Sequence, residues 1–150
     1  MADILWVDDE PHRLDYEVYE LTLLHHNVRR VESVDVARAV LARARWDLVL
    51  LDQLMPLGGL ELSPLAGATL HHWLRYGDYA ALPWSGEVNE ATYGSEETPV
   101  NRDTPVILIS AIHSAVTTTY WAAESVVVIP KPIFLDSLLS GCRRALKGAD

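Results

Sequence analysis

The segment Leu48-Val-Leu-Leu-Asp-Gln-Leu-Met-Pro56 opens with four consecutive apolar residues and becomes polar at Asp52. A strand that is apolar at every position is typical of a parallel sheet that helices cover on both faces. Three other short runs share this character, at residues 4–7, 106–109 and 126–129. A fifth run, residues 28–32, contains Arg29 and Arg30 in its middle, which favours an edge strand.

Helical periodicity fills the gaps between these runs. Leu14, Val18 and Leu21 recur at helical spacing after Pro11, a residue well placed to open a helix. Further helices are expected after Ser33 with a stripe that includes Val36, around residues 70–74, over residues 114–124, and from residue 135 to about 146. The run of threonines at 117–119 makes the fourth of these helices a poor helix former.

Strands that alternate with helices predict a doubly wound α/β fold. Right-handed crossovers make the strands parallel, so their carboxyl ends share one edge of the sheet. Two segments interrupt the alternation. Residues 56–67 are rich in Leu, Pro and Gly, and residues 82–104 are polar and acidic. Segments of this length predict irregular loops.

Charge and composition exclude several classes of protein. The 150 residues carry 12 basic and 21 acidic side chains, for a net charge of -9, which argues against binding to nucleic-acid phosphates. The single cysteine, Cys142, excludes a disulfide framework and a cysteine zinc site. The apolar runs are too short to span a bilayer, and the first residues lack the pattern of a signal peptide. We therefore expect a cytoplasmic protein without nucleic-acid or membrane partners.

Polar side chains follow four of the expected strands. They are Asp8 and Asp9, Asp52, Ser110, and Lys131. Three carboxylates in one pocket repel one another unless a cation compensates them. Mg²⁺ suits such a site because it binds one or two carboxylates and leaves positions for phosphate oxygens. A carboxylate nucleophile, a metal and a fixed ammonium group are what the acceptance of a phosphoryl group requires.

Four motifs together resemble the receiver domain of two-component response regulators. They are Asp8-Asp9, Leu50-Leu-Asp-Gln-Leu-Met-Pro56, Ile109-Ser-Ala111 and Lys131-Pro132, and they occur in the family's order. The resemblance runs from residue 4 to about residue 146. It implies a flavodoxin-like, five-stranded parallel sheet with strand order 2-1-3-4-5. It also implies one receiver domain over residues 1–150, with an insertion at about 82–104 between strands 3 and 4, and no output domain.

The resemblance also implies a role for each residue of the site. Asp52 would be the phosphoacceptor, Ser110 the switch hydroxyl, and Lys131 the ion-pair partner of the phosphoryl group. The implied Mg²⁺ ligands are Asp8, Asp9, Asp52 and the backbone carbonyl of Leu54. The peptide bond between Lys131 and Pro132 is often cis in this family.

The implied function is that of a stand-alone receiver in a phosphorelay. It would accept a phosphoryl group from a sensor histidine kinase or a phosphotransfer protein. It would then bind a downstream protein through its fourth helix, fifth strand and fifth helix. We expect no turnover of a separate substrate. In this family, the residues two positions beyond the phosphoacceptor and the switch hydroxyl influence the access of water to the acyl phosphate. Here they are Leu54 and Ile112, both apolar, so the resemblance implies slow self-dephosphorylation.

Three alternatives remain beside this interpretation. Val128 replaces the family's usual aromatic residue, so a degenerate receiver that acts as an unphosphorylated adaptor is one of them. A phosphatase would use Asp52 as nucleophile but needs a second acid where Leu54 stands. A flavin-binding domain would need a phosphate-binding loop where Asp8-Asp9-Glu10 would repel phosphate.

Some conspicuous residues have simpler interpretations. The pairs His25-His26 and His71-His72 have poor geometry for chelating a metal and are expected at the surface or in packing. Cys142 is expected in the core. Trp84 and Tyr93 could anchor a partner protein or, as we expect, pin the insertion onto the domain. Asp8 and Asp9 could also cap the first helix.

Overall fold

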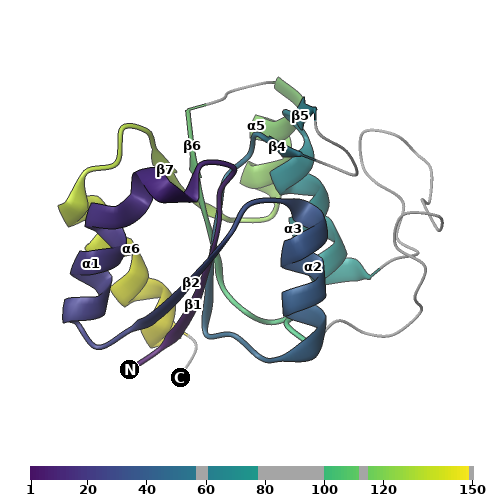
Figure 1. Ribbon diagram of the computed structural model, residues 1–150. Helices are drawn as coiled ribbons and strands as arrows, with labels where there is room; N and C mark the ends of the chain where they lie inside the picture. Colours follow the sequence, from purple (N-terminus) through teal and green to yellow (C-terminus); the bar gives the residue numbers. More distant parts are fainter. Residues whose placement is uncertain (57–60, 78–99, 112–114, 149–150) are drawn as a thin grey trace.

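The computed structural model describes residues 1–56, 61–77, 100–111 and 115–148 (Figure 1). In these residues one parallel sheet has the strand order β2-β1-β3-β6-β7, which is the predicted order 2-1-3-4-5. The strands are β1 (Asp3–Val7), β2 (Asn27–Val31), β3 (Leu48–Leu51), β6 (Val106–Ser110) and β7 (Val127–Pro130). The flavodoxin-like fold is thereby confirmed, and residues 78–99, which belong to the enlarged segment, lie between β3 and β6 and outside the described residues.

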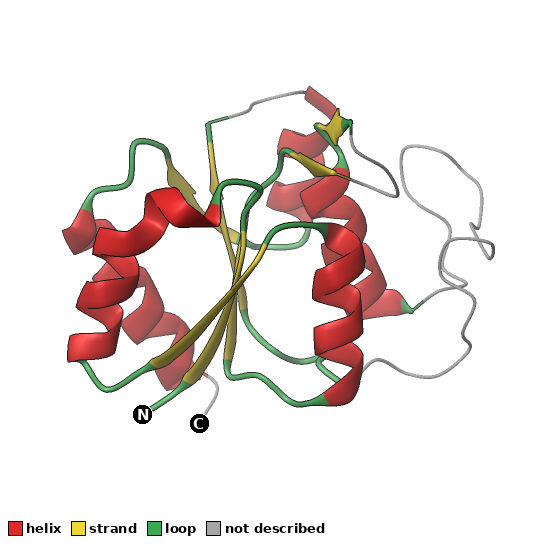
Figure 2. Cartoon of the chain, viewed as in Figure 1, coloured by secondary structure: helices red, strands yellow, loops and turns green. Residues whose placement is uncertain are grey.

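Helices cover both faces of the sheet (Figure 2). They are the 3-10 helix η1 (Pro11–Leu14), α1 (Asp15–Leu23), α2 (Val34–Arg43), α3 (Ala66–Tyr76), α5 (Ala115–Ala123) and α6 (Leu135–Gly148). The helices α1 and α6 lie on one face, and α2, α3 and α5 lie on the other (Figure 1). None of the helices in the described residues is both long enough and apolar enough to cross a membrane.

The central strands are buried on both faces, as their sequence predicts. Ile4 and Trp6 join the core beneath α1 and α6, whereas Leu5 and Val7 join the core beneath α2, α3 and α5. All four side chains are fully buried, and so are those of β3. The residues that follow these strands are thus carried by the most deeply buried part of the sheet.

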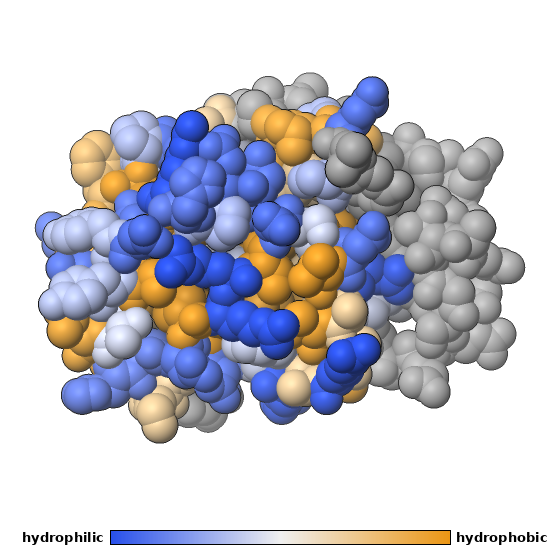
Figure 3. Space-filling view, viewed as in Figure 1, coloured by the Kyte–Doolittle hydropathy of each residue, from blue (hydrophilic) through white to orange (hydrophobic). Residues whose placement is uncertain are grey.

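The two edge strands differ from the centre. In β2, Arg29 and Arg30 alternate between exposed and half-buried positions, which confirms the predicted edge strand. On this side of the molecule hydrophilic residues cross the middle of the surface, with hydrophobic patches between them (Figure 3). At the other edge of the sheet, our prediction of burial is wrong. We expected residues 126–129 to be covered on both faces, but Val127 and Val128 are exposed, because among the described residues β7 is an edge strand that pairs with β6 alone.

Local signals explain where the helices begin and end. Pro11 opens η1, which continues into α1. The Ser33 hydroxyl accepts a hydrogen bond of 3.3 Å from the Val36 amide and caps α2. Gly77 ends α3 with a φ of 85°, a conformation that favours glycine. Val36 itself is 43% exposed, so the predicted stripe of α2 is wrong at that position.

The segment 56–67 is not wholly a loop as we expected. The short strands β4 (Met55–Pro56) and β5 (Leu62–Ser63) form an antiparallel pair, and α3 already begins at Ala66. Such a pair depends on contact between two short strands, for which the Leu/Pro/Gly-rich composition gives no periodic signal. Trp84 and Tyr93 lie outside the described residues.

Candidate phosphoacceptor site

The predicted site residues meet at the carboxyl edge of the sheet. Asp8 directly follows β1, Asp52 directly follows β3, Ser110 ends β6, and Lys131 directly follows β7. These four strands are neighbours in the sheet, with parallel pairing throughout. The topology therefore brings together residues that are up to 123 positions apart in the chain.

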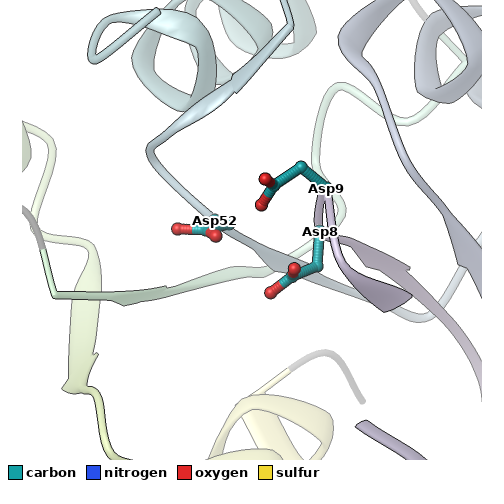
Figure 4. A group of neighbouring side chains, drawn as sticks. All are labelled: Asp8, Asp9 and Asp52. Atoms are coloured by element: carbon teal, nitrogen blue, oxygen red, sulfur yellow. The ribbon is translucent and has the colours of Figure 1, made fainter. Parts of the chain in front are cut away.

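Three carboxylates form the centre of the site. One oxygen atom from each of Asp8, Asp9 and Asp52 lies within 4.8 Å of the others. Asp8 and Asp9 extend from the end of β1 toward the side on which Asp52 lies (Figure 4). Asp8 is 2% exposed and Asp52 is 5% exposed, so two of the three charges are almost completely removed from water.

Lys131 compensates the two buried carboxylates. Its Nζ donates a hydrogen bond of 3.0 Å to Oδ2 of Asp52 and one of 3.1 Å to Oδ2 of Asp8. The peptide bond from Lys131 to Pro132 is cis. Because removing one member of a buried charge pair leaves the other uncompensated, this lysine is the main electrostatic support of the cluster.

The electrostatics of the site are those of crowded acidic groups. Burial raises the pKa of Asp52, while the hydrogen bond and the charge of Lys131 oppose the rise. Burial, and then the charges of Asp8 and Glu10, raise the pKa of Asp9. Burial alone would lower the pKa of Lys131, but the hydrogen bond and charge of Asp52 outweigh it and raise that pKa. A divalent cation would compensate the negative charges of these carboxyl groups and so reduce the repulsion between them.

Backbone hydrogen bonds hold the loops that carry these residues. The Asp52 amide donates to the carbonyl of Val7 at 2.9 Å, and the Asp8 amide donates to the carbonyl of Val31 at 3.0 Å. Oδ1 of Asp8 accepts a hydrogen bond of 2.8 Å from the Glu10 amide. Asp8 thus stabilises the turn before η1 while its other oxygen binds Lys131.

Sequence reasoning missed Gln53. Its side chain is completely buried. Its backbone amide donates a hydrogen bond of 2.7 Å to Oδ1 of Asp52. Its Oε1 accepts a hydrogen bond of 3.1 Å from Nε1 of Trp121 on α5, and its Nε2 donates to the carbonyl of Pro64. Its only signal in the sequence is that it follows Asp52.

Some other residues that the sequence points to as candidates are buried in the structure. Histidines 71 and 72 are buried on α3, where Nδ1 of His71 is hydrogen-bonded to the Tyr120 hydroxyl at 2.6 Å. This confirms the predicted packing role of the pair. Cys142 lies on α6 and is buried in the core, as expected. Ser110 is buried at the end of β6, and Ile112 lies outside the described residues.

The donor set fits Mg²⁺. This ion prefers oxygen ligands and is usually bound by one or two carboxylates, with water and phosphate oxygens in the other positions. Asp8, Asp9 and Asp52 provide oxygen atoms of this kind, and the cluster contains no nitrogen or sulfur ligand among the described residues. The cluster therefore has the donor chemistry that a hard cation prefers, and two of its three carboxyl groups are buried.

No protein-family model matches the sequence, and no curated protein matches it. Solved structures do match. The chain is similar to the receiver domain of the Francisella response regulator 1452, with 16% sequence identity, a TM-score of 0.72 and 100% of each chain covered.

Two other matches are of the same kind. A CheY-like receiver domain protein from Methanospirillum hungatei JF-1 has 19% identity and a TM-score of 0.69, over 99% of this chain and 96% of that chain. The signal receiver domain of a signal transduction histidine kinase from Syntrophus aciditrophicus has 23% identity and a TM-score of 0.67, over 99% of this chain and 92% of that chain. These matches confirm the fold that the four motifs implied. In its described residues the chain therefore has the fold of the response regulator receiver domains.

Proposed function

We propose that this chain is a phosphorylatable receiver whose Asp52 accepts a phosphoryl group in a Mg²⁺-dependent reaction. The observation that supports this best is the position of Lys131, whose Nζ joins the buried carboxylates of Asp8 and Asp52. A buried acidic cluster with one fixed ammonium group is costly to assemble for stability alone. It suits a site that must stabilise a transferring phosphoryl group.

The proposed reaction is a transfer between two residues. A carboxylate oxygen of Asp52 attacks the phosphorus of a phosphohistidine, an oxygen–phosphorus bond forms, and the nitrogen–phosphorus bond breaks. The imidazole leaves with the electron pair of that bond and takes up a proton. When bound, Mg²⁺ would neutralise charge on the phosphoryl oxygens and orient them. Asp8, Asp9, Asp52 and the backbone carbonyl of Leu54 would hold it.

Lys131 and Ser110 have proposed roles around the new phosphoryl group. Lys131 favours the ionised form of Asp52 before the reaction, since its hydrogen bond and charge oppose the rise that burial causes in the pKa of Asp52. After transfer, its ammonium group would pair with a phosphoryl oxygen. The buried hydroxyl of Ser110 would donate a hydrogen bond to another such oxygen.

The proposed partners are proteins. A sensor histidine kinase or a phosphotransfer protein would supply the phosphoryl group. A downstream protein would bind the face formed by α5, β7 and α6, where Val127 is 56% exposed and Val128 is 41% exposed. We place the chain, as one receiver domain over residues 1–150, in the cytoplasm, acting as a signalling module without turnover of a separate substrate.

An unphosphorylated adaptor is the second candidate function. Val128 favours it, because an exposed valine on an edge strand has no polar group through which to respond to a change at Asp52. The acidic cluster and Lys131 favour the phosphorylatable receiver. An experiment on phosphorylation separates the two candidates.

The test is intact mass spectrometry after incubation with a small acyl phosphate, with and without Mg²⁺. We expect one added phosphoryl group that requires both Mg²⁺ and Asp52, so Asp52→Asn abolishes it. Asp136→Asn, which changes an exposed carboxylate at the start of α6, is the matched control and leaves the adduct unchanged. If a phosphorylated histidine kinase also gives no adduct on a folded, Mg²⁺-binding protein, the adaptor function replaces this proposal.

A further inference from the structure

Gln53 contacts both Asp52 and the helix α5. Its carboxamide is fully buried, and a buried amide is costly unless its polar atoms are hydrogen-bonded. Here both ends are bonded: Nε2 donates to the carbonyl of Pro64, and Oε1 accepts from Nε1 of Trp121 at 3.1 Å. Its backbone amide donates to Oδ1 of Asp52 at 2.7 Å. One residue therefore contacts the carboxylate and a helix on the same side of the sheet.

The only polar atom of the Trp121 side chain, Nε1, is hydrogen-bonded to Gln53. An indole has one donor, Nε1–H, and no acceptor, so the bond to Gln53 uses its whole hydrogen-bonding capacity. The Trp121 side chain is 4% exposed, and its ring meets the His71 ring edge-on at 5.1 Å between centroids. A buried indole with one fixed donor has few alternative positions.

A second hydrogen bond connects α5 to α3, the helix that begins next to Gln53. The Tyr120 hydroxyl, next to Trp121, is hydrogen-bonded to Nδ1 of His71 at 2.6 Å. His71 lies on α3, and α3 begins against Gln53, because the Gly67 amide donates to the Gln53 carbonyl at 3.1 Å. Both buried aromatic side chains of α5 are thus connected, directly or through α3, to the residue that follows Asp52.

Phosphorylation changes the group that Gln53 contacts. It removes the negative charge from the carboxyl group of Asp52 and places charge on the phosphoryl oxygens. A hydrogen bond to an ionised acceptor is about twice as strong as one to a neutral acceptor. The bond from the Gln53 amide to Oδ1 therefore weakens when Asp52 becomes an acyl phosphate. Because the backbone amide and the carboxamide belong to the same residue, a change in the first hydrogen bond also shifts the buried carboxamide and its partner Trp121.

We propose that Gln53 is a positioning residue for Asp52 and that Trp121 is the side chain through which α5 responds to the state of Asp52. This inference rests on the proposed function and deepens it. It gives the chain an aromatic response on α5 although position 128, on β7, carries an exposed valine. The Gln53–Trp121 hydrogen bond is the two-state element whose equilibrium the phosphoryl group biases.

Indole ¹⁵N–¹H resonances test the proposal. The chain has five tryptophans, and Trp121→Phe, which keeps a buried aromatic ring, assigns the Trp121 signal. We expect the Trp121 indole signal to shift on addition of beryllofluoride and Mg²⁺, and to shift in the same direction on phosphorylation. The indole of Trp6, buried beneath the opposite helical layer, is the internal control and should shift less.

The matched variant is Gln53→Met, which has similar length, keeps the backbone amide and removes the acceptor for Trp121. We expect it to be phosphorylated on Asp52 while the shift of the Trp121 signal is lost. Trp73→Phe, at another buried tryptophan of the same layer, should leave the Trp121 shift intact.

The outcomes are distinguishable. If wild-type protein is phosphorylated but the Trp121 signal does not move, this inference is wrong and the proposed function stands. The same conclusion follows if Gln53→Met is phosphorylated and retains the full shift. If Gln53→Met does not fold, the wild-type spectrum alone decides. If wild-type protein neither forms an adduct nor binds beryllofluoride, the proposed function fails and this inference fails with it.

Discussion

A Cβ atom at position 67 would lie 2.5 Å from the carbonyl oxygen of Asp52, so only glycine at this position lets α3 approach the backbone of the candidate phosphoacceptor. The same Cβ would lie 2.9 Å from Cα of Gln53. Both contacts are with backbone atoms, which cannot rotate away as a side chain can. The first turn of α3 and the loop after β3 are therefore packed as one unit.

Gly67→Ala should destabilise the protein because the loop after β3 must move. We expect a loss of about 1–3 kcal/mol in the free energy of unfolding, the usual range for overpacking a core. Chemical denaturation measures it. The control is Gly141→Ala in α6, where the new Cβ would meet only the flexible tips of isoleucine side chains, the nearer being that of Ile129 at 3.2 Å. If the two variants were equally stable, the close approach of α3 would not be a constraint.

Lys131→Met should slow phosphorylation of Asp52. It removes the ammonium group that donates a hydrogen bond to Asp52 and that would pair with the phosphoryl group. Removal of one such donor commonly slows a reaction by about 10²-fold or more. The rate of adduct formation by mass spectrometry is the measurement. Lys147→Met, at the chain's only other lysine and on an exposed position, is the control. A rate equal to that of wild type would contradict the role of Lys131.

His71 should make the protein less stable in acid. Burial, followed by the charges of Arg75 and His72, lowers the pKa of His71 from 6.5 to about 3. At a pH between these values His71 binds a proton in the unfolded chain but not in the folded protein. Its contribution to stability is therefore lost progressively as the pH falls from about 6.5 toward about 3, by about 1.4 kcal/mol per pH unit.

The measurement is urea denaturation at several pH values from about neutral down to about pH 4, a range that spans the loss expected from linkage. We expect His71→Gln to reduce the dependence of the unfolding free energy on pH, even if it lowers stability at neutral pH. The exposed His25 provides the matched control, and His25→Gln should leave the dependence unchanged. A His71→Gln protein with the wild-type pH dependence would show that another group titrates.

Leu54→Asn should shorten the lifetime of the phosphorylated form. Leu54 is half-buried and stands two residues after Asp52, and we expect its apolar side chain to limit the approach of water to an acyl phosphate on Asp52. A polar amide in its place can hold a water molecule. We expect dephosphorylation to be up to about tenfold faster, which corresponds to ~1.4 kcal/mol in the barrier. The decay of the adduct mass is the measurement, and an unchanged decay would refute this steric explanation.

The sequence alone predicts the positions of the central strands and the location of the site. Residues 4–7 and 48–51 are apolar throughout, and parallel strands place the residues that come after them at one edge. For that reason Asp8, Asp52 and Lys131 could be brought together without knowledge of any contact. The acidic cluster and its lysine result from local pattern and chain direction.

The sequence does not reveal contacts between helices. Gln53 has no distinguishing signal beside Asp52, yet it joins α5 through Trp121, which is 68 positions away. The sequence indicated that His71 serves in packing, but it did not predict the hydrogen bond between His71 and Tyr120. Val127 and Val128 have the composition of a buried strand, and only the sheet order makes them an exposed edge.

Pattern along the chain thus determined the fold class, the central strands and the residue types at the carboxyl edge, because each depends on near neighbours and on strand direction. Tertiary structure alone decided the edge exposure of β7, the approach of Gly67 to Asp52 and the Gln53–Trp121 bond. These depend on which distant surfaces pack together, and many sequences with the same periodicity satisfy the local requirements equally well.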